Sequence, residues 1–188
     1  MAVKEILRIG HPLLRGTAST VVEFNTAQLE RLVTDMLDTM HAADGAGLAA
    51  PQIGVPLRVV IFGVDGNPRY PGAPDVPLTV LVNPALEITD PFSCYGWEGC
   101  LSVPGMRGLV PRPRQIRYHG RSPDGGPIAV TASDFHARVV LHECDHLDGV
   151  LYPQRIEDMR CFGYEAELAD LISRWPDAPP PASAFAEG

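Results

Sequence analysis

The sequence predicts an α+β fold in which mostly antiparallel β-sheets surround a central helix, with an N-terminal helix packed outside and a C-terminal helix. Two observations support this prediction. Short runs rich in β-branched residues recur between residues 58 and 133, and turn-forming residues separate them. One amphipathic helical pattern precedes these runs, and two more follow them.

Length and composition indicate one globular domain. The 188 residues are enough for one well-buried core, and the 45% hydrophobic and 20% charged residues are ordinary for a globular protein. We expect residues 1–175 to form a single domain. The Pro- and Ala-rich residues 176–188 are expected to form a disordered tail.

Charge and hydropathy exclude several classes of protein. The net charge of −8 argues against direct nucleic-acid binding, and the arginines between residues 107 and 121 are interpreted as solvated charges. No stretch reaches the ~18 apolar residues of a membrane span, and the N-terminus lacks the features of a signal or presequence. We therefore expect no membrane association and a cytoplasmic location, where the four cysteines would be thiols or metal ligands.

The N-terminal third contains an arm, a helix and an apolar loop. Residues 1–24 are expected to be irregular. The helix is predicted over about residues 26–43, with Asn25 as its N-cap and Gln28 completing a capping box. Residues 47–54 (GLAAPQIG) follow as a loop of small apolar residues with one amide side chain, at position 52. Such an amide more often binds the backbone than takes part in catalysis.

The strands come next. The turn SPDGG at residues 122–126 predicts a hairpin, and the Gly- and Pro-rich residues 65–77 predict a loop. Strands are predicted at residues 58–64, 78–83, 86–89, 115–121 and 128–133.

Two helices follow the last strand. The first is expected to begin after the N-cap Ser133 and to end at Gly149 in the left-handed conformation. The second is predicted over residues 164–174, where Pro176 stops it.

The first of these helices contains an H-E-x-x-H pattern. Residues four apart lie nearly in line on a helix, so His142 and His146 can direct both imidazoles at one ion, with Glu143 beside it. Two imidazoles suit a divalent transition metal, and a carboxylate beside a metal-bound water suits a general base. The central helix is therefore expected to bind a metal ion.

The residues alone leave the third ligand open. A catalytic metal usually has three protein ligands and one open position. Cys144 lies about 200° around the helix from His142 and is interpreted as a core residue. Cys100 lies in an apolar segment bracketed by Gly and Pro, but its spacing fits an ordinary buried cysteine equally well. The candidates are Cys94, Cys100, Cys161, Glu157, Glu165 and Glu167.

Three segments together resemble the peptide deformylase family: GLAAPQIG at residues 47–54, EGCLS at 98–102 and HECDHLDG at 142–149. Their order and separations are also similar to that family. The likeness extends from the N-terminal arm to about Leu171. It implies that residues 1–175 form a single deformylase-like catalytic domain.

The resemblance implies a hydrolase that removes the formyl group from the N-terminal formylmethionine of newly made polypeptides and releases formate. The metal ligands would be Cys100, His142 and His146. Metal-bound water or hydroxide would attack the formyl carbon, with Glu143 as general acid and base. The metal would be Fe(II) in the cell, with Zn, Ni or Co possible in a purified sample. The partners would be N-formylmethionyl nascent peptides near the ribosome.

The resemblance also implies roles around the metal. The Gln52 amide and the backbone N–H of Leu101 would stabilise the oxyanion, and the backbone of Gly47 would hold the substrate. For Arg107, we expect a place at the cleft and hypothesise a contact with Asp44.

Apolar residues are candidates for the methionine pocket, and one residue beside the ligands differs from the family's usual sequence. Val139, Leu101 and Ile53 are apolar candidates to line the pocket for the methionine side chain. The departure is Leu141, where the family usually has Gln immediately before the first histidine.

Two other interpretations are compatible with the histidine pair. A zinc endopeptidase would use His142, His146 and a downstream glutamate, Glu165 or Glu167, as ligands. A non-catalytic domain with a structural metal would need a fourth ligand, such as Cys94 or Cys161. Neither interpretation explains the apolar loop at residues 47–54.

Overall fold

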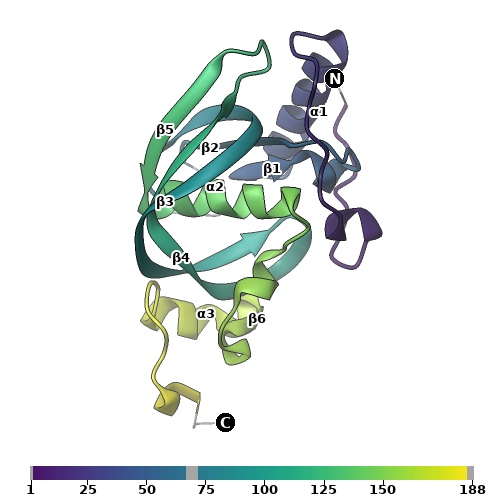
Figure 1. Cartoon of the computed structure of the whole chain (residues 1–188). Coiled ribbons are helices and arrows are strands. Elements are labelled where there is room, and N and C mark those ends of the chain that lie inside the picture. The colour runs from purple at the N-terminus through teal and green to yellow at the C-terminus, as the bar shows by residue number, and fades with distance from the viewer. Residues whose placement is uncertain (1, 67–71, 186–188) are drawn as a thin grey trace.

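A curved antiparallel sheet surrounds helix α2 in the computed structural model, which describes residues 2–66 and 72–185 (Figure 1). The strand order is β1–β2–β3–β4–β5, and β6 pairs with β4. Helix α1 lies outside the sheet beside the N-terminal arm, and α3 lies at the opposite end (Figure 1). This is the predicted α+β arrangement.

The strands are β1 Gly47–Ala49, β2 Val59–Val64, β3 Val76–Cys100, β4 Val103–Arg121, β5 Pro127–Ser133 and β6 Phe162–Tyr164. The helices are α1 Ala27–Ala42, α2 Asp134–Leu147 and α3 Glu165–Arg174, with short 3-10 turns at Pro12–Arg15, Ala50–Ile53, Tyr152–Arg155, Met159–Cys161 and Ala182–Phe185.

The hairpin of β3 and β4 is far longer than the sequence predicted. The expected strands 78–83 and 86–89 are both parts of β3, and the expected strand 115–121 is only the end of β4. Two prolines of β3 are accommodated at irregularities of the strand, because register shifts fall between Val82 and Ala85 and between Asp90 and Ser93, around Pro84 and Pro91.

Helix α2 follows β5 without a loop. Ser133 is its N-cap, as predicted, but its hydroxyl accepts a hydrogen bond from Gln115 Nε2 rather than capping the helix. At the other end Gly149 has φ +73°, and the Val150 N–H donates to the Asp145 carbonyl at 2.9 Å, which together form a Schellman-type end. The predicted left-handed glycine is confirmed.

The cap of α1 was predicted one residue too early. Thr26 is the N-cap, and its hydroxyl accepts a hydrogen bond from the Leu29 N–H at 3.2 Å. Asn25 instead has φ +56°, in the left-handed region that Asn tolerates well. The capping box with Gln28 is therefore wrong, because a box needs the Glu or Gln three residues after the cap, and Leu29 occupies that position.

The predicted apolar loop at residues 47–54 is partly regular. Gly47–Ala49 form strand β1, which pairs with β2, and Ala50–Ile53 form a 3-10 turn. The strand is wholly buried between two apolar clusters, one against α2 and one against α1. A three-residue strand is too short to show a period in the sequence, so only its sheet partner reveals it.

The C-terminal end continues past α3. Residues 176–179 of the expected tail line a hollow together with residues of β3 and α3, while residues 186–188 lie outside the described residues. The segment ends in the 3-10 turn Ala182–Phe185, which lies under the guanidinium of Arg160. In the described part of the chain, no helix is long and apolar enough to cross a membrane.

Candidate metal centre and its cleft

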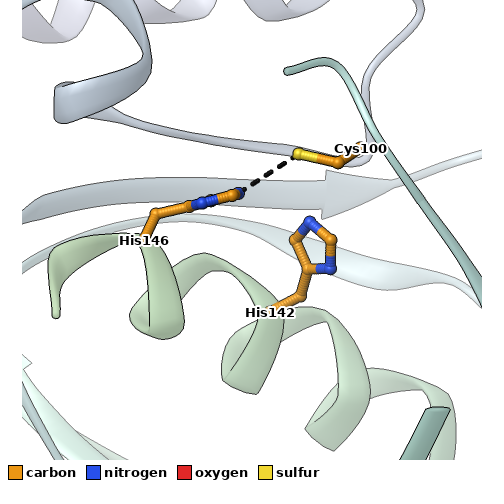
Figure 2. Close-up of side chains that lie close together, drawn as sticks. All are labelled: Cys100, His142 and His146. Carbon is orange, nitrogen blue, oxygen red and sulfur yellow. Dashed lines mark hydrogen bonds between the residues drawn. The ribbon is translucent and has the colours of Figure 1, made fainter. Parts of the chain in front are cut away.

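Three ligand-type side chains converge between β3 and α2. His142 and His146 rise from one face of α2 toward Cys100 at the end of β3 (Figure 2). One ligand atom from each residue lies within 4.8 Å of the others, and Cys100 Sγ lies 3.4 Å from His146 Nε2. Within residues 2–66 and 72–185 this is the group of three that could hold a metal ion.

A tight turn places the cysteine. Cys100 pairs with Val103 across the β3–β4 hairpin, so Leu101 and Ser102 form the two residues of the turn. The thiol is therefore fixed at the end of a paired strand, and it is only 4% exposed. A ligand on such a rigid element keeps its position without the metal, which favours binding.

The electrostatic environment favours the ligand form of the cysteine. Burial alone would raise the pKa of the Cys100 thiol, but the charge of His146 and a hydrogen bond with His142 outweigh burial and hold it well below its usual value. The thiolate is the form in which cysteine binds a metal ion.

Glu98 orients the first histidine. Its Oε2 lies 2.9 Å from His142 Nδ1, so an Nδ1–H donor leaves Nε2 of the ring available for a metal. The His142 ring also stacks on Tyr152, with an interplanar angle of 24°. His146 lies edge-on to His142, with ring centroids 5.1 Å apart.

Two arginines hold Glu98 as a buried carboxylate. Arg112 binds it in a bidentate manner, with Nε 2.9 Å from Oε1 and a terminal nitrogen 3.0 Å from Oε2. Arg138 donates to Oε1 at 2.8 Å. Burial would raise the pKa of Glu98, but the charge of Arg112 and the bond with His142 lower it far below its usual value. Glu98 therefore stays ionised and fixes the ring beside it.

No role was predicted for Glu98, although the sequence carries a signal for one. Side chains two residues apart on a strand point to the same side of the sheet, so Glu98 faces the same way as Cys100. The sequence did not reveal its partners, because Arg112 and Arg138 are 14 and 40 residues away.

Replacing Glu98 by Gln is expected to destabilise the fold by about 3–5 kcal/mol, because the buried guanidinium groups lose their counter-charge. Urea unfolding of the metal-free protein measures this change. Glu87→Gln is the matched control, since Glu87 is an exposed carboxylate on the same strand. Equal stability of the two variants would contradict a structural role for the Glu98 charge.

The amide oxygen of Gln52 binds the backbone, and its amide nitrogen contacts residues of the metal centre. Its Oε1 accepts the Ala49 N–H at 2.8 Å, as expected for an amide in an apolar loop. Its Nε2 lies 3.1 Å from Ser102 Oγ and 3.5 Å from Cys100 Sγ. The bond to the backbone thus aims the amide N–H groups at the metal centre.

Glu143 is buried beside the three ligand atoms. Its Oε2 has no hydrogen-bond partner in the described part of the chain, and a Cβ on Gly47 would lie only 2.3 Å from its Oε1. Only glycine therefore allows strand β1 to approach this carboxylate. Burial raises the pKa of Glu143 to about 7, against the opposing charges of His142 and His146.

These residues fit a divalent metal ion. One thiolate and two imidazoles are nitrogen and sulfur donors of the kind that transition metals prefer. The Oε2 of Glu143 is buried and has no hydrogen-bond partner among the described residues. A buried polar atom without a partner costs free energy, so a water or a ligand is expected to bind it. A divalent ion with three protein ligands keeps a position open for reaction.

The cleft beside the metal centre is formed by β3, β1 and α2. Of the residues predicted to hold the substrate or line the methionine pocket, Gly47, Leu101 and Val139 line it. Ile53 does not, because it packs in the cluster beneath α1. The lining residues that were not predicted include Trp97 of β3, and Phe135 and Arg138 of α2. The two helical residues are seven and four positions before His142, so helical periodicity could have identified them.

The remaining candidates lie away from the metal group. Cys144 is buried in the core as predicted, and burial raises the pKa of its thiol. Cys94 and Cys161 are free thiols outside the group. Glu157 accepts a hydrogen bond from the Tyr95 hydroxyl at 2.7 Å, and Glu167 is exposed on α3.

Arg107 lies near the outer end of the cleft. Its guanidinium forms an ion pair with Glu165 at 3.2 Å, and the arginine side chain is only 7% exposed. Glu165 thus contacts an arginine outside the metal group, contrary to the endopeptidase interpretation. The coupling of Arg107 to Asp44 stays a prediction.

Comparison with known sequences identifies close relatives. A sequence model of the family described as polypeptide deformylase matches residues 3–161. The chain is 57% identical over 166 residues to peptide deformylase 1 of Nitrosomonas europaea, which covers 88% of this chain and 94% of that protein. It is 50% identical over 186 residues to peptide deformylase 1 of Prochlorococcus marinus, which covers 97% of each chain.

Solved structures show the same fold. A class I type b peptide deformylase from Acinetobacter baumannii bound to Met-Ala-Ser has a TM-score of 0.80 and 38% identity, over 82% of this chain and 99% of that chain. A peptide deformylase from Synechococcus elongatus in complex with actinonin has a TM-score of 0.74 and 31% identity, over 93% of this chain and 90% of that chain.

Proposed function

This chain belongs to the polypeptide deformylase family, and we propose that Cys100, His142 and His146 hold the metal ion with which it removes the formyl group from nascent polypeptides. One observation carries the proposal: three donor atoms from two distant segments lie within 4.8 Å of one another, beside a buried carboxylate. When bound, a divalent ion supplies Lewis-acid chemistry and lowers the pKa of water toward neutrality.

Glu143 is proposed as the general acid and base. Its buried carboxylate accepts a proton from the attacking water and later passes a proton to the amine, which must leave neutral when the C–N bond of the formamide breaks. A pKa of about 7 suits both steps near neutral pH. The partnerless Oε2 leaves one carboxylate oxygen available for the water.

The amide of Gln52 and the backbone N–H of Leu101 are proposed to stabilise the negative charge that develops on the formyl oxygen. The Gln52 Nε2 already faces the Cys100 end of the cleft, where this charge forms. Hydrogen-bond donors held in place before reaction stabilise such charge effectively. The backbone of Gly47 and the Arg107 side chain are proposed to bind the substrate, because Gly47 lines the cleft and Arg107 lies beyond its outer end.

Replacing Gln52 by Ala is expected to lower kcat about 10²–10³-fold, as the loss of an oxyanion donor does. Gln154→Ala is a matched control. Gln154 accepts the Leu151 N–H at 2.7 Å with the same three-residue spacing, but it lies outside the cleft. Steady-state kinetics of both variants separate the two roles of the Gln52 amide. Equal, small effects in both variants would leave Gln52 with its backbone role alone.

We propose Fe(II) as the ion in the cell, with Zn, Ni or Co able to replace it in a purified sample. The ligands themselves do not select iron, because affinity for divalent ions rises from Fe toward Cu, so occupancy follows supply. A thiolate ligand beside Fe(II) would be prone to oxidation, so the iron enzyme should lose activity in air.

The substrate is proposed to be N-formylmethionyl nascent chains near the ribosome, in the cytoplasm. The relative from Acinetobacter baumannii that binds Met-Ala-Ser supports a peptide beginning with methionine. The deciding experiment is purification without oxygen, measurement of bound metal, and an assay of formate release from a formyl-Met peptide. A metal-loaded sample that releases no formate would reject the proposal.

A further inference from the structure

We propose that residues 176–179 of the C-terminal segment, which runs from Trp175 to Phe185, form an outer wall of the substrate cleft and contact the third and later residues of formylated peptides. This inference rests on the proposed function. It concerns a part of the chain beyond residue 161, where the match to the family model ends.

A groove continues the cleft outward. Trp97, Phe135 and Arg138 line both the cleft beside the metal ligands and a second hollow on its outer side. The far side of this hollow is lined by residues 176–179 of the C-terminal segment. The described residues therefore form one path, from the metal ligands past Trp97 to these prolines.

Two contacts hold the segment in place. The indole Nε1 of Trp97 donates a hydrogen bond to the Trp175 carbonyl at 2.8 Å. The guanidinium of Arg160 lies 4.4 Å from the ring centroid of Phe185. Because Trp97 itself lines the cleft, the first contact ties the segment to a residue that the substrate passes.

Distance along α2 indicates which part of a peptide reaches the groove. Phe135 precedes Glu143 by eight residues, which is about 12 Å along a helix axis. An extended chain spans ~3.3–3.6 Å per residue, so about three to four residues bridge this distance. A formylmethionine at the metal centre therefore brings the third and later residues to the groove.

The groove is lined mostly by apolar side chains, against which an extended peptide of any sequence can pack. Phe92 is 67% exposed beside Ile172 and the prolines of the segment. Proline has no N–H to donate, so Pro176 and Pro179 contribute apolar surface to this wall and no backbone donor. Of the charged groups beside it, Arg107 forms an ion pair with Glu165, and Asp134 forms one with Arg114. The groove should therefore detect the length of a peptide more than its sequence.

The test compares a short and a long substrate, formyl-Met-Ala amide and formyl-Met-Ala-Ala-Ala-Ala amide. The unaltered enzyme should favour the long peptide in kcat/KM by about five- to tenfold, the effect of a few buried apolar groups. A chain ending at Trp175, and the P176G/P179S variant, should reduce this ratio to near one. The matched control P180G/P181S also removes two prolines but leaves the groove lining intact, so it should keep the ratio.

Binding gives a second readout. The sequence has two tryptophans, and both lie at this junction. Titration with the product peptide Met-Ala-Ala-Ala-Ala amide should shift the tryptophan emission more than Met-Ala amide does, and the P176G/P179S variant should lose the difference.

Different results of these experiments would reject the proposed outer wall and the proposed deformylase function. A ratio near one in the unaltered enzyme, or an equal ratio in all variants, would overturn the wall. Equal losses on both peptides would overturn it too, since they would indicate damage to the cleft. If the unaltered enzyme releases formate from neither peptide, the proposed function fails, whereas the titration would still report on the groove.

Discussion

Cys100→Ala is expected to abolish stoichiometric metal binding and, with it, formate release. The residue supplies the only sulfur of the proposed ligand set, and its thiolate balances one of the two charges of a divalent ion. Even changes to groups that only support a ligand lower metal affinity about 10–100-fold, so loss of a ligand should exceed that range. Metal analysis after dialysis measures the effect without relying on activity.

Cys144→Ala is the matched control for this experiment. Cys144 is equally buried and lies between the two histidines in the sequence of α2, but its side chain belongs to the hydrophobic core. This variant should keep its metal. The same comparison tests the endopeptidase interpretation, in which Cys100 is not a ligand. A Cys100→Ala protein that retains one tightly bound ion would therefore support that rival and reject the present ligand set.

Glu143→Gln should separate metal binding from turnover. The amide has nearly the same shape as the carboxylate and leaves the three ligand atoms untouched, so the metal content should not change. It cannot accept the proton of the attacking water, so kcat should fall about 10²–10⁴-fold. Metal analysis and formate assays on one sample measure both quantities.

Glu167→Gln provides the control for Glu143→Gln. Glu167 is an exposed carboxylate on α3, and the endopeptidase interpretation names it as a ligand. Its replacement should change neither metal content nor turnover. If Glu143→Gln kept full turnover, proton transfer would have to be assigned to another group.

Local patterns were sufficient for the elements that depend on neighbouring residues. The H-E-x-x-H helix lies where its spacing, its cap residue and Gly149 predicted it. The hairpin turn at residues 122–126 was predicted correctly for the same reason, because its glycines act locally. The hairpin of β3 and β4 was underestimated, since only the partner strand shows that Pro84 and Pro91 lie at register shifts within β3.

The sequence by itself determined the helix that presents His142 and His146 and, through the three motifs, the family to which the chain belongs. Only the tertiary structure decided which carboxylate orients His142, where the two amide atoms of Gln52 point and where the C-terminal segment lies. The physical reason is sequence separation. Helical periodicity links residues a few positions apart, whereas Glu98 meets His142 across 44 residues and Trp97 meets Trp175 across 78. Such contacts arise when the sheet curves around α2, and no local pattern encodes them.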